Sequence, residues 1–315
     1  ASGSEISGLV FSPAGGIAIA AAGDRVTKII NTASIVGNTM RYEEVEPIIS
    51  LNSSSPSGSQ SPQADQTVGI YNIKSEGGRD MTFNSLTIEK SGSNSPQQYV
   101  TAFSLWNGSN KIAEVANTTV AGTTGVGHTN ADATLSICTG ASGAVGEVGN
   151  ITAAEAATIA IGDKFIIVDG TNTNTDVTVT NKTGTLGACA GASITVTFDA
   201  TVNIAASATV TFRNYRVHFD ANQANTGDTA LAEQTITAGQ TMTLTVKANT
   251  ASVRTGVASG TVTFGIAVPG VAGPLQVGAT QIEGLNWDYT PLGSGAAAYR
   301  TEVDGYPVNG STLSY

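Results

Sequence analysis

Short runs in which apolar and polar residues alternate recur along nearly the whole chain. Two clear examples are "TMTLTVK" (residues 241–247) and "TVTFGI" (residues 261–266). An alternation with a period of two matches a β-strand, whose successive side chains point to opposite faces of a sheet. The inward-facing residues predicted from these two runs are Met242, Leu244, Val246, Val262, Phe264 and Ile266. Many such runs, separated by turns rich in Gly and Asn, predict an all-β fold built as a sandwich or a barrel.

Two longer runs carry additional turn and bulge signals. In "GRDMTFNSLTIEKSG" (residues 78–92) the alternation changes phase at Asn84 and Ser85, which predicts a β-bulge. In "QQYVTAFSLWNGSNKIAEV" (residues 97–115) the Asn107-Gly108 dipeptide separates two alternating halves. This arrangement predicts a β-hairpin.

The composition excludes some classes of partner. Charged residues make up only 12% of the 315 residues, the net charge is −10, and the 14 Lys and Arg residues are scattered. Binding to a nucleic-acid backbone requires clustered basic residues, so we exclude nucleic acid as a partner. The sequence contains no run of about eighteen apolar residues, the length that predicts a membrane-spanning helix. The opening "ASGSE" resembles a mature end left by signal cleavage, so we expect a secreted, extracellular or cell-surface protein.

The chain contains only two cysteines, Cys138 and Cys189, and both lie in loop-like sequence rich in Gly and Ala. Neither has a His neighbour or the spacing of a metal-binding motif, so a metal site is not expected at these residues. We predict a disulfide between them. In an oxidising compartment this bond would remove about 4 kcal/mol of unfolded-chain entropy by closing the loop between the two residues.

The composition of the predicted strand regions changes along the chain, which suggests more than one domain. Residues 116–207 are poor in aromatics, contain both cysteines, and include one helix-like segment, "ITAAEAATIAIG" (residues 151–162). We interpret them as a small β-domain inserted into a sandwich, since loop tips whose ends lie close together tolerate insertions. The predicted sandwich consists of residues 45–115 plus 208–290, with an N-terminal arm (1–44) and a C-terminal extension (291–315). A single large sandwich with a long excursion is the alternative.

The sandwich segments resemble a known type of module. The series "LTIEKSG", "SLWNGSNKIAE", "ITAGQTMTLTVKANT" and "SGTVTFGIAV" resembles the immunoglobulin-like modules of bacterial surface-layer and other cell-surface proteins. The resemblance covers roughly residues 45–266 without the insertion, and it departs from the family by having one module and an inserted domain. It implies an immunoglobulin-like β-sandwich, display at the cell surface and assembly with other subunits.

The most apolar stretch, "ISGLVFSPAGGIAIAAAG" (residues 6–23), lies near the start. A pilin-type helix is disfavoured because Pro13 and the following Gly pair would break it. Two alternatives remain: a strand of the chain's own sandwich, or a strand donated to a neighbouring subunit. About seventeen extended residues reach roughly 55 Å, enough to span a second subunit. The candidate polymerisation residues are Ile6, Leu9, Val10, Phe11, Ile17 and Ile19.

The arm is similar in placement, length and Gly and Ala content to those of TasA-like biofilm fibres and archaeal bundling pili. That resemblance implies donor-strand assembly. Because head-to-tail donation between copies does not close on itself, it would build a fibre.

Residues suited to catalysis are few. Only His128 and His218 are histidines, and no nucleophile elbow, HExxH motif or phosphate-binding loop accompanies them. The "YRVHFD" context predicts that His218 is a strand residue without a catalytic role. We therefore do not expect an enzyme.

The sequence also offers candidates for two kinds of ligand site. The segment "DGTNTNTD" offers side-chain oxygens that suit calcium. The candidate ligands are Asp169, Asn172, Asn174 and Asp176. Trp106 and Trp287 are candidates for a sugar-stacking platform toward cell-surface polysaccharide, although large aromatics usually lie in a core or an interface.

The sequence favours a structural, self-associating subunit of an extracellular filament that donates its N-terminal strand. Two alternatives are a surface-layer lattice held by lateral contacts and calcium, and a carbohydrate-binding adhesive module.

Overall fold

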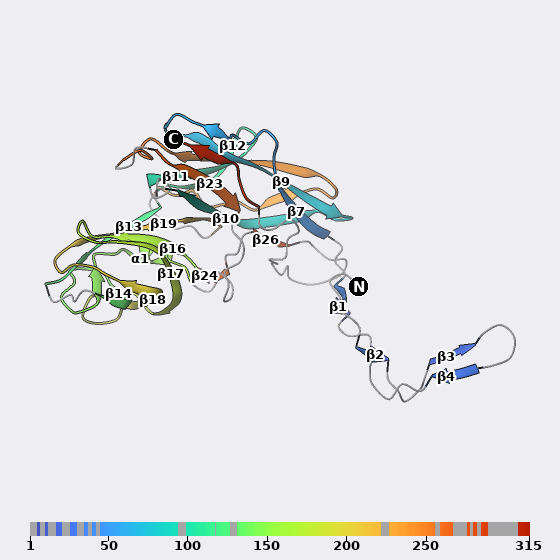
Figure 1. Cartoon of the computed structure of the whole chain (residues 1–315), viewed down its shortest axis with the longest axis horizontal. Coiled ribbons are helices and arrows are strands. Elements are labelled where there is room, and N and C mark those ends of the chain that lie inside the picture. The colour runs from blue at the N-terminus through green and yellow to red at the C-terminus, as the bar shows by residue number, and fades with distance from the viewer. Residues whose placement is uncertain are drawn as a thin grey trace.

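The computed structural model in Figure 1 describes most of the chain beyond residue 44 and short strands before it. The described residues are 5–6, 10–11, 17–20, 26–29, 35–36, 40–41, 45–93, 99–116, 118–126, 131–221, 227–255, 259–266, 276–277, 280–281, 285–288 and 308–315. Nearly all of the regular structure among them is β-strand, as the alternation predicts. Figure 1 shows a sandwich, a barrel beside it, and a line of short N-terminal strands that leads away.

One sheet of the sandwich has five strands in the order β12-β11-β22-β9-β7. Their bounds are Asn110–Val115 (β12), Thr101–Asn107 (β11), Thr241–Asn249 (β22), Gln66–Gly77 (β9) and Val45–Leu51 (β7). Every neighbouring pair in this sheet is antiparallel. The edge strand β7 contains Pro47, which cannot donate a backbone hydrogen bond and is therefore suited to a sheet edge.

The second sheet is organised around one long strand, β10 (Met81–Ser93). The main path of strands is β20-β10-β23-β27-β8, and β21 and β26 also pair with β10. Their bounds are Arg216–Asp220 (β20), Thr261–Ile266 (β23), Thr312–Ser314 (β27), Gly58–Ser59 (β8), Gln234–Ile236 (β21) and Leu285–Asp288 (β26). Strands β24 (Gln276–Val277) and β25 (Thr280–Gln281) form a separate two-stranded sheet.

The sandwich core lies between the two sheets. Phe103 on β11 and Phe264 on β23 contact across it with ring centroids 6.1 Å apart. Leu244 and Val246 are fully buried, as their alternation predicts, whereas Met242 is only half-buried. The predicted inward faces are therefore correct, and the half-buried Met242 marks a place where the core reaches the surface.

The local turn and bulge predictions are confirmed. The pairing of β10 with β26 shifts register between Phe83 and Ser85, at the expected bulge. Strands β11 and β12 form the expected hairpin, closed by Asn107 opposite Asn110. Gly108 in the turn has φ of +60°, a left-handed conformation that glycine adopts without steric cost.

Seven strands form a closed barrel in the order β13-β15-β14-β18-β17-β16-β19. Their bounds are Thr119–Thr124 (β13), Glu147–Gly149 (β15), Asp132–Ile137 (β14), Ile194–Val202 (β18), Thr173–Gly184 (β17), Lys164–Val168 (β16) and Thr209–Asn214 (β19). The barrel has its own core, which includes Phe165 and Phe212 packed edge to face.

The single described helix, α1 (Ala153–Ala157), begins at a capping box. The Thr152 hydroxyl accepts a hydrogen bond from the Glu155 N–H, and the Glu155 carboxylate accepts one from the Thr152 N–H. This reciprocal pair satisfies two N–H groups at the helix start. Among the described residues, no helix is long and apolar enough to span a membrane.

The boundary between barrel and sandwich differs from the one expected. The run "ATVTFRNYRVHF" (residues 208–219) reads as one sandwich strand, but the chain bends at Tyr215. Strand β19 before the bend pairs with β13 and β16 of the barrel, whereas β20 after it pairs with β10 of the sandwich. The barrel strands therefore span Thr119 to Asn214 and extend past residue 207, the predicted end of the inserted domain.

The final residues belong to the sandwich and not to a separate extension. Strand β27 pairs antiparallel with β23 and parallel with β8. Leu313 is fully buried, and the hydroxyl of the buried Tyr315 donates a hydrogen bond of 3.0 Å to Gln66 Oε1. The chain end thus completes the second sheet.

Candidate functional site

The described part of the N-terminal arm consists of three strand pairs. β1 (Glu5–Ile6) pairs with β6 (Met40–Arg41), β2 (Val10–Phe11) with β5 (Ile35–Val36), and β3 (Ile17–Ala20) with β4 (Val26–Ile29). All three are antiparallel and share one register, because the numbers of the paired residues always add to 46. The three described pairs therefore share the register of a single hairpin.

The arm strands pair only with one another in the described part of the chain. In Figure 1, β1, β2 and the β3–β4 pair lie progressively farther from the sandwich. A two-stranded ribbon without a third strand is marginally stable in water, and each of its outer edges carries unpaired backbone groups. The arm is therefore suited to pairing with another sheet.

The predicted polymerisation residues fall on these strands, with one exception. Ile6 is in β1, Val10 and Phe11 are in β2, and Ile17 and Ile19 are in β3. Leu9 lies outside the described residues. A single extended donor strand was expected from this segment, whereas its described strands pair with β4, β5 and β6 of the same chain.

The clearest polar cluster joins the sandwich to the barrel. His218 on β20 has its Nε2 atom 2.8 Å from Asp163 Oδ1 and its Nδ1 atom 2.9 Å from Thr87 Oγ1. The Asp163 side chain, next to β16, is completely buried, and its Oδ2 accepts a hydrogen bond from the Ala160 N–H. Nothing in the sequence around Asp163 predicted this role, because its partner lies 55 residues away.

The Thr87, His218 and Asp163 cluster has the residue types of a hydrolase triad but not its geometry. In a catalytic triad the nucleophile faces the Nε2 atom and the carboxylate faces Nδ1, whereas the two partners are exchanged here. Thr87 is also fully buried, which denies its hydroxyl access to a substrate. The cluster is therefore suited to holding two bodies together. The other histidine, His128, lies outside the described residues.

Further contacts strengthen the same junction. The Arg216 guanidinium binds Glu89 Oε2 on β10 at 2.9 Å and also donates to the Gly162 carbonyl of the barrel at 2.9 Å. Lys90, one residue after Glu89, is buried, and its Nζ donates to the Val100 carbonyl at 3.1 Å. Burial lowers the pKa of Lys90 to about 7. The Arg216–Gly162 bond joins the barrel to the sandwich, whereas the Arg216–Glu89 and Lys90–Val100 bonds lie within the sandwich.

The candidate calcium residues form a hydrogen-bonded loop. Asp169 accepts hydrogen bonds from the N–H groups of Thr171, Asn172 and Ala205 and from the Asn172 side chain. Burial by itself would raise the pKa of Asp169, but these hydrogen bonds lower it to about 2. A carboxylate whose oxygens already accept N–H donors is poorly placed to bind a cation.

The other two candidate ligands are also engaged. The Asn174 amide donates to the Ile167 and Asn203 carbonyls, and its oxygen accepts the Asn203 N–H. The exposed Asp176 lies 3.8 Å from Lys164 Nζ. The Asp169 carboxylate accepts N–H donors, whereas the Asp176 carboxylate lies near a lysine ammonium. This geometry argues against a calcium site shared by the two carboxylates.

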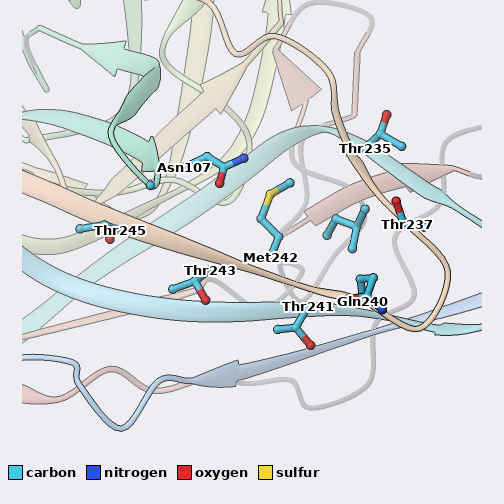
Figure 2. A pocket seen from close by; sticks show the side chains of 10 residues that line it. Asn107, Thr235, Thr237, Gln240, Thr241, Met242, Thr243 and Thr245 are labelled. Carbon is cyan, nitrogen blue, oxygen red and sulfur yellow. The ribbon is translucent and has the colours of Figure 1, made fainter.

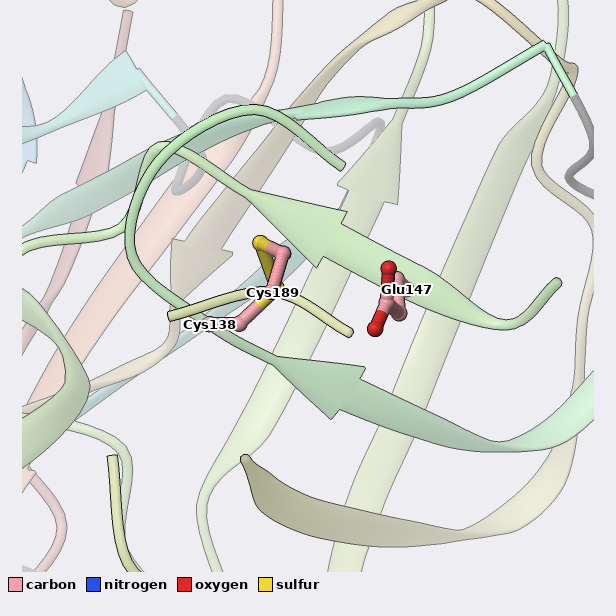
Figure 3. Close-up of side chains that lie close together, drawn as sticks. All are labelled: Cys138, Glu147 and Cys189. Carbon is pink, nitrogen blue, oxygen red and sulfur yellow. A yellow bond between two sulfur atoms is a disulfide. The ribbon is translucent and has the colours of Figure 1, made fainter. Parts of the chain in front are cut away.

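The predicted disulfide is present between Cys138 and Cys189, whose Cα atoms are 5.0 Å apart (Figure 3). Glu147 lies beside it, and the three side chains are close enough to resemble a metal-binding cluster. The oxidised cysteines offer no thiolate ligands. The Glu147 carboxylate accepts hydrogen bonds from the N–H groups of Ala190, Ala144 and Gly143, which lower its pKa although the residue is buried. This group therefore closes a loop and does not form a metal centre.

The two tryptophans do not form a shared platform. Trp287 on β26 is 1% exposed and belongs to the sandwich core. Trp106 on β11 is only half-buried, and Lys247 Nζ lies 4.3 Å from its ring centroid. Its indole N–H donates to Ser104 Oγ at 2.8 Å. The ammonium group of Lys247 thus already covers one face of the ring.

Comparisons with known proteins identify no relative. No protein-family model matches the chain, and no curated protein or solved structure matches it significantly.

Proposed function

We propose that the chain is a non-enzymatic structural subunit of an extracellular filament, which polymerises through its N-terminal arm. The observation that carries this proposal is the shared register of strands β1 to β6, which pair only with one another among the described residues. A ribbon of this kind gains stability when a second sheet pairs with one of its edges.

The chemistry of the arm supports self-association. Residues 6–23 contain no charged side chain. A neutral strand with small and apolar residues joins a foreign sheet without the desolvation cost of buried charges. Because the donating arm and the accepting surface are different parts of the subunit, each added copy leaves one of each free, and an open filament results.

We also propose that the sandwich is an immunoglobulin-like module of the kind displayed at cell surfaces. Its two mainly antiparallel sheets, the alternating inward faces and the β11–β12 hairpin support this proposal. The inserted barrel lies beside one sheet, where the junction around His218 holds it in a fixed orientation for outward display.

Electron microscopy and sedimentation of the purified protein test the role of the arm. The full chain is expected to form uniform fibres, and a variant without residues 1–44 is expected to sediment as a monodisperse monomer. The deletion leaves every described strand pairing of the sandwich and the barrel intact. Fibres formed equally well by the deletion variant would exclude polymerisation through the arm.

A further inference from the structure

A notch of about 420 Å³ opens at the side of the sandwich, where a ladder of the five-stranded sheet is incomplete (Figure 2). Strand β11 ends at Asn107, which pairs with Leu244 of β22. The preceding residues of β22, Thr241 to Thr243, pair with β9 on one side. On the other side no strand pairs with them within the part of the chain that the structure describes.

The opposite wall of the notch is also a strand edge. It is formed by β21, which pairs with β10 through Gln234 to Ile236 and with no other described strand. Figure 2 shows Thr235 and Thr237 on this wall and Asn107 at the end of β11, with Met242 between them. Two incomplete ladders therefore border the same space, and unpaired strand edges are where a further strand pairs.

The lining of the notch indicates what kind of strand fits it. None of its ten lining residues is charged, and five of them are threonines. Ile236 and the half-buried Met242 belong to or pack against the sandwich core, so they offer apolar contacts to a side chain that enters. A charged strand would lose hydration here without gaining a partner for its charge. A small, neutral strand has no charge to desolvate and so avoids this cost.

We infer that this notch is the acceptor site for the arm of a second copy. In this arrangement strand β3 (Ile17–Ala20) pairs with the free edge of β22, in line with β11. Strand β3 is one of the two longest described strands of the arm, and unlike β4, which contains Lys28, it has no charged residue. Its sequence, "IAIA", combines small size with apolar side chains that suit Ile236 and Met242. This inference rests on the proposed filament function and adds the position at which successive subunits join.

Blocking the notch tests the inference separately from the function. Thr241 and Thr243 line the notch and are exposed, so Thr241→Arg with Thr243→Arg places two bulky charges at its rim at little cost to folding. Thr237→Arg, also exposed, blocks the opposite wall as an independent variant. The matched control is Thr175→Arg with Thr180→Arg, two exposed positions on β17 of the barrel.

The notch variants are expected to lose fibres while they keep the wild-type melting temperature, and the control is expected to polymerise normally. A chain without residues 1–44 keeps its notch, and the Thr241→Arg and Thr243→Arg variant keeps its arm. Neither should polymerise alone, but a mixture should form a one-to-one heterodimer in sedimentation experiments.

The outcomes separate the two claims. If the wild-type chain forms no polymer, the proposed function fails, and this inference fails with it. If wild type polymerises and the arm deletion does not, but both notch variants form normal fibres, the filament function stands and the notch is not the acceptor. Absence of the heterodimer from the mixture would overturn the notch assignment in the same way.

Discussion

His218 Nε2 and Asp163 Oδ1, 2.8 Å apart, connect a sandwich strand to a turn of the barrel. The Asp163 side chain is completely buried and the His218 side chain is 9% exposed. A buried carboxylate without a partner is costly, so this contact contributes to how firmly the two bodies are joined.

His218→Ala is expected to lower the free energy of unfolding by about 3 kcal/mol, because it leaves Asp163 Oδ1 buried without its partner. The matched control is Lys111→Ala, which removes the partly exposed ion pair with Glu114 and should cost less than about 1 kcal/mol. Urea unfolding measures both. Equal losses in the two variants would contradict the role of the His218 contact.

The disulfide is expected to stabilise the barrel selectively. Replacing Cys138 and Cys189 together by Ser opens a loop with a sequence separation of 51 residues and should cost the barrel about 4 kcal/mol. Both tryptophans lie in sandwich strands, so tryptophan fluorescence reports on the sandwich. Far-ultraviolet circular dichroism also detects the barrel. An equal shift of both signals would show that the bond does not act on the barrel alone.

Lys90 is expected to destabilise the fold at neutral pH. Burial lowers its pKa from 10.5 to about 7, so between these values the unfolded chain binds a proton that the folded chain does not. Stability therefore rises with pH across this window, and below pH 7 the full penalty is present. Lys90→Met should raise the unfolding free energy at pH 7 by a few kcal/mol and flatten the profile from pH 7 to 10.5.

The control for this pH profile is Lys74→Met, since Lys74 is 42% exposed and pairs with Glu76 at the surface. Its profile should follow that of wild type. A Lys90→Met protein that keeps the wild-type slope between pH 7 and 10.5 would show that Lys90 does not titrate in this range.

The Asp169 loop is expected to be stable without calcium. Neither added calcium nor a chelator should change the melting temperature of the barrel, because N–H donors already occupy the Asp169 oxygens. A calcium-dependent rise would restore the calcium prediction. Asp169→Ala should cost about 2 kcal/mol by leaving several donors unsatisfied, whereas the exposed Asp176→Ala should cost little.

The pH dependence of the same loop follows from its lowered pKa of about 2. The ionised Asp169 contributes stability that is present above its ordinary pKa near 4 and is lost as the pH falls through about 2. Acid titration of barrel unfolding should show this loss in wild type. The loss should be smaller in Asp169→Ala, and identical acid profiles would contradict the assignment.

Local features were largely predictable because short-range chemistry decides them. The phase change at Asn84 and Ser85, the Asn107-Gly108 hairpin and the helix near Ala153 all follow from neighbouring residues. The disulfide was predictable for a different reason, since the chain offers only one possible pair. The sandwich faces followed from period-two alternation.

By itself, the sequence determined the all-β class, the inward faces and the uncharged character of residues 6–23, because alternation and composition report which side chains avoid water. Only the tertiary structure decided which strand pairs with which. The alternating run around Tyr215 serves two different sheets, the last strand pairs with β23 and β8, and His218 meets a carboxylate 55 residues away. The physical reason is that alternation identifies the buried face of a strand but carries no information about its neighbours, which depend on long-range packing.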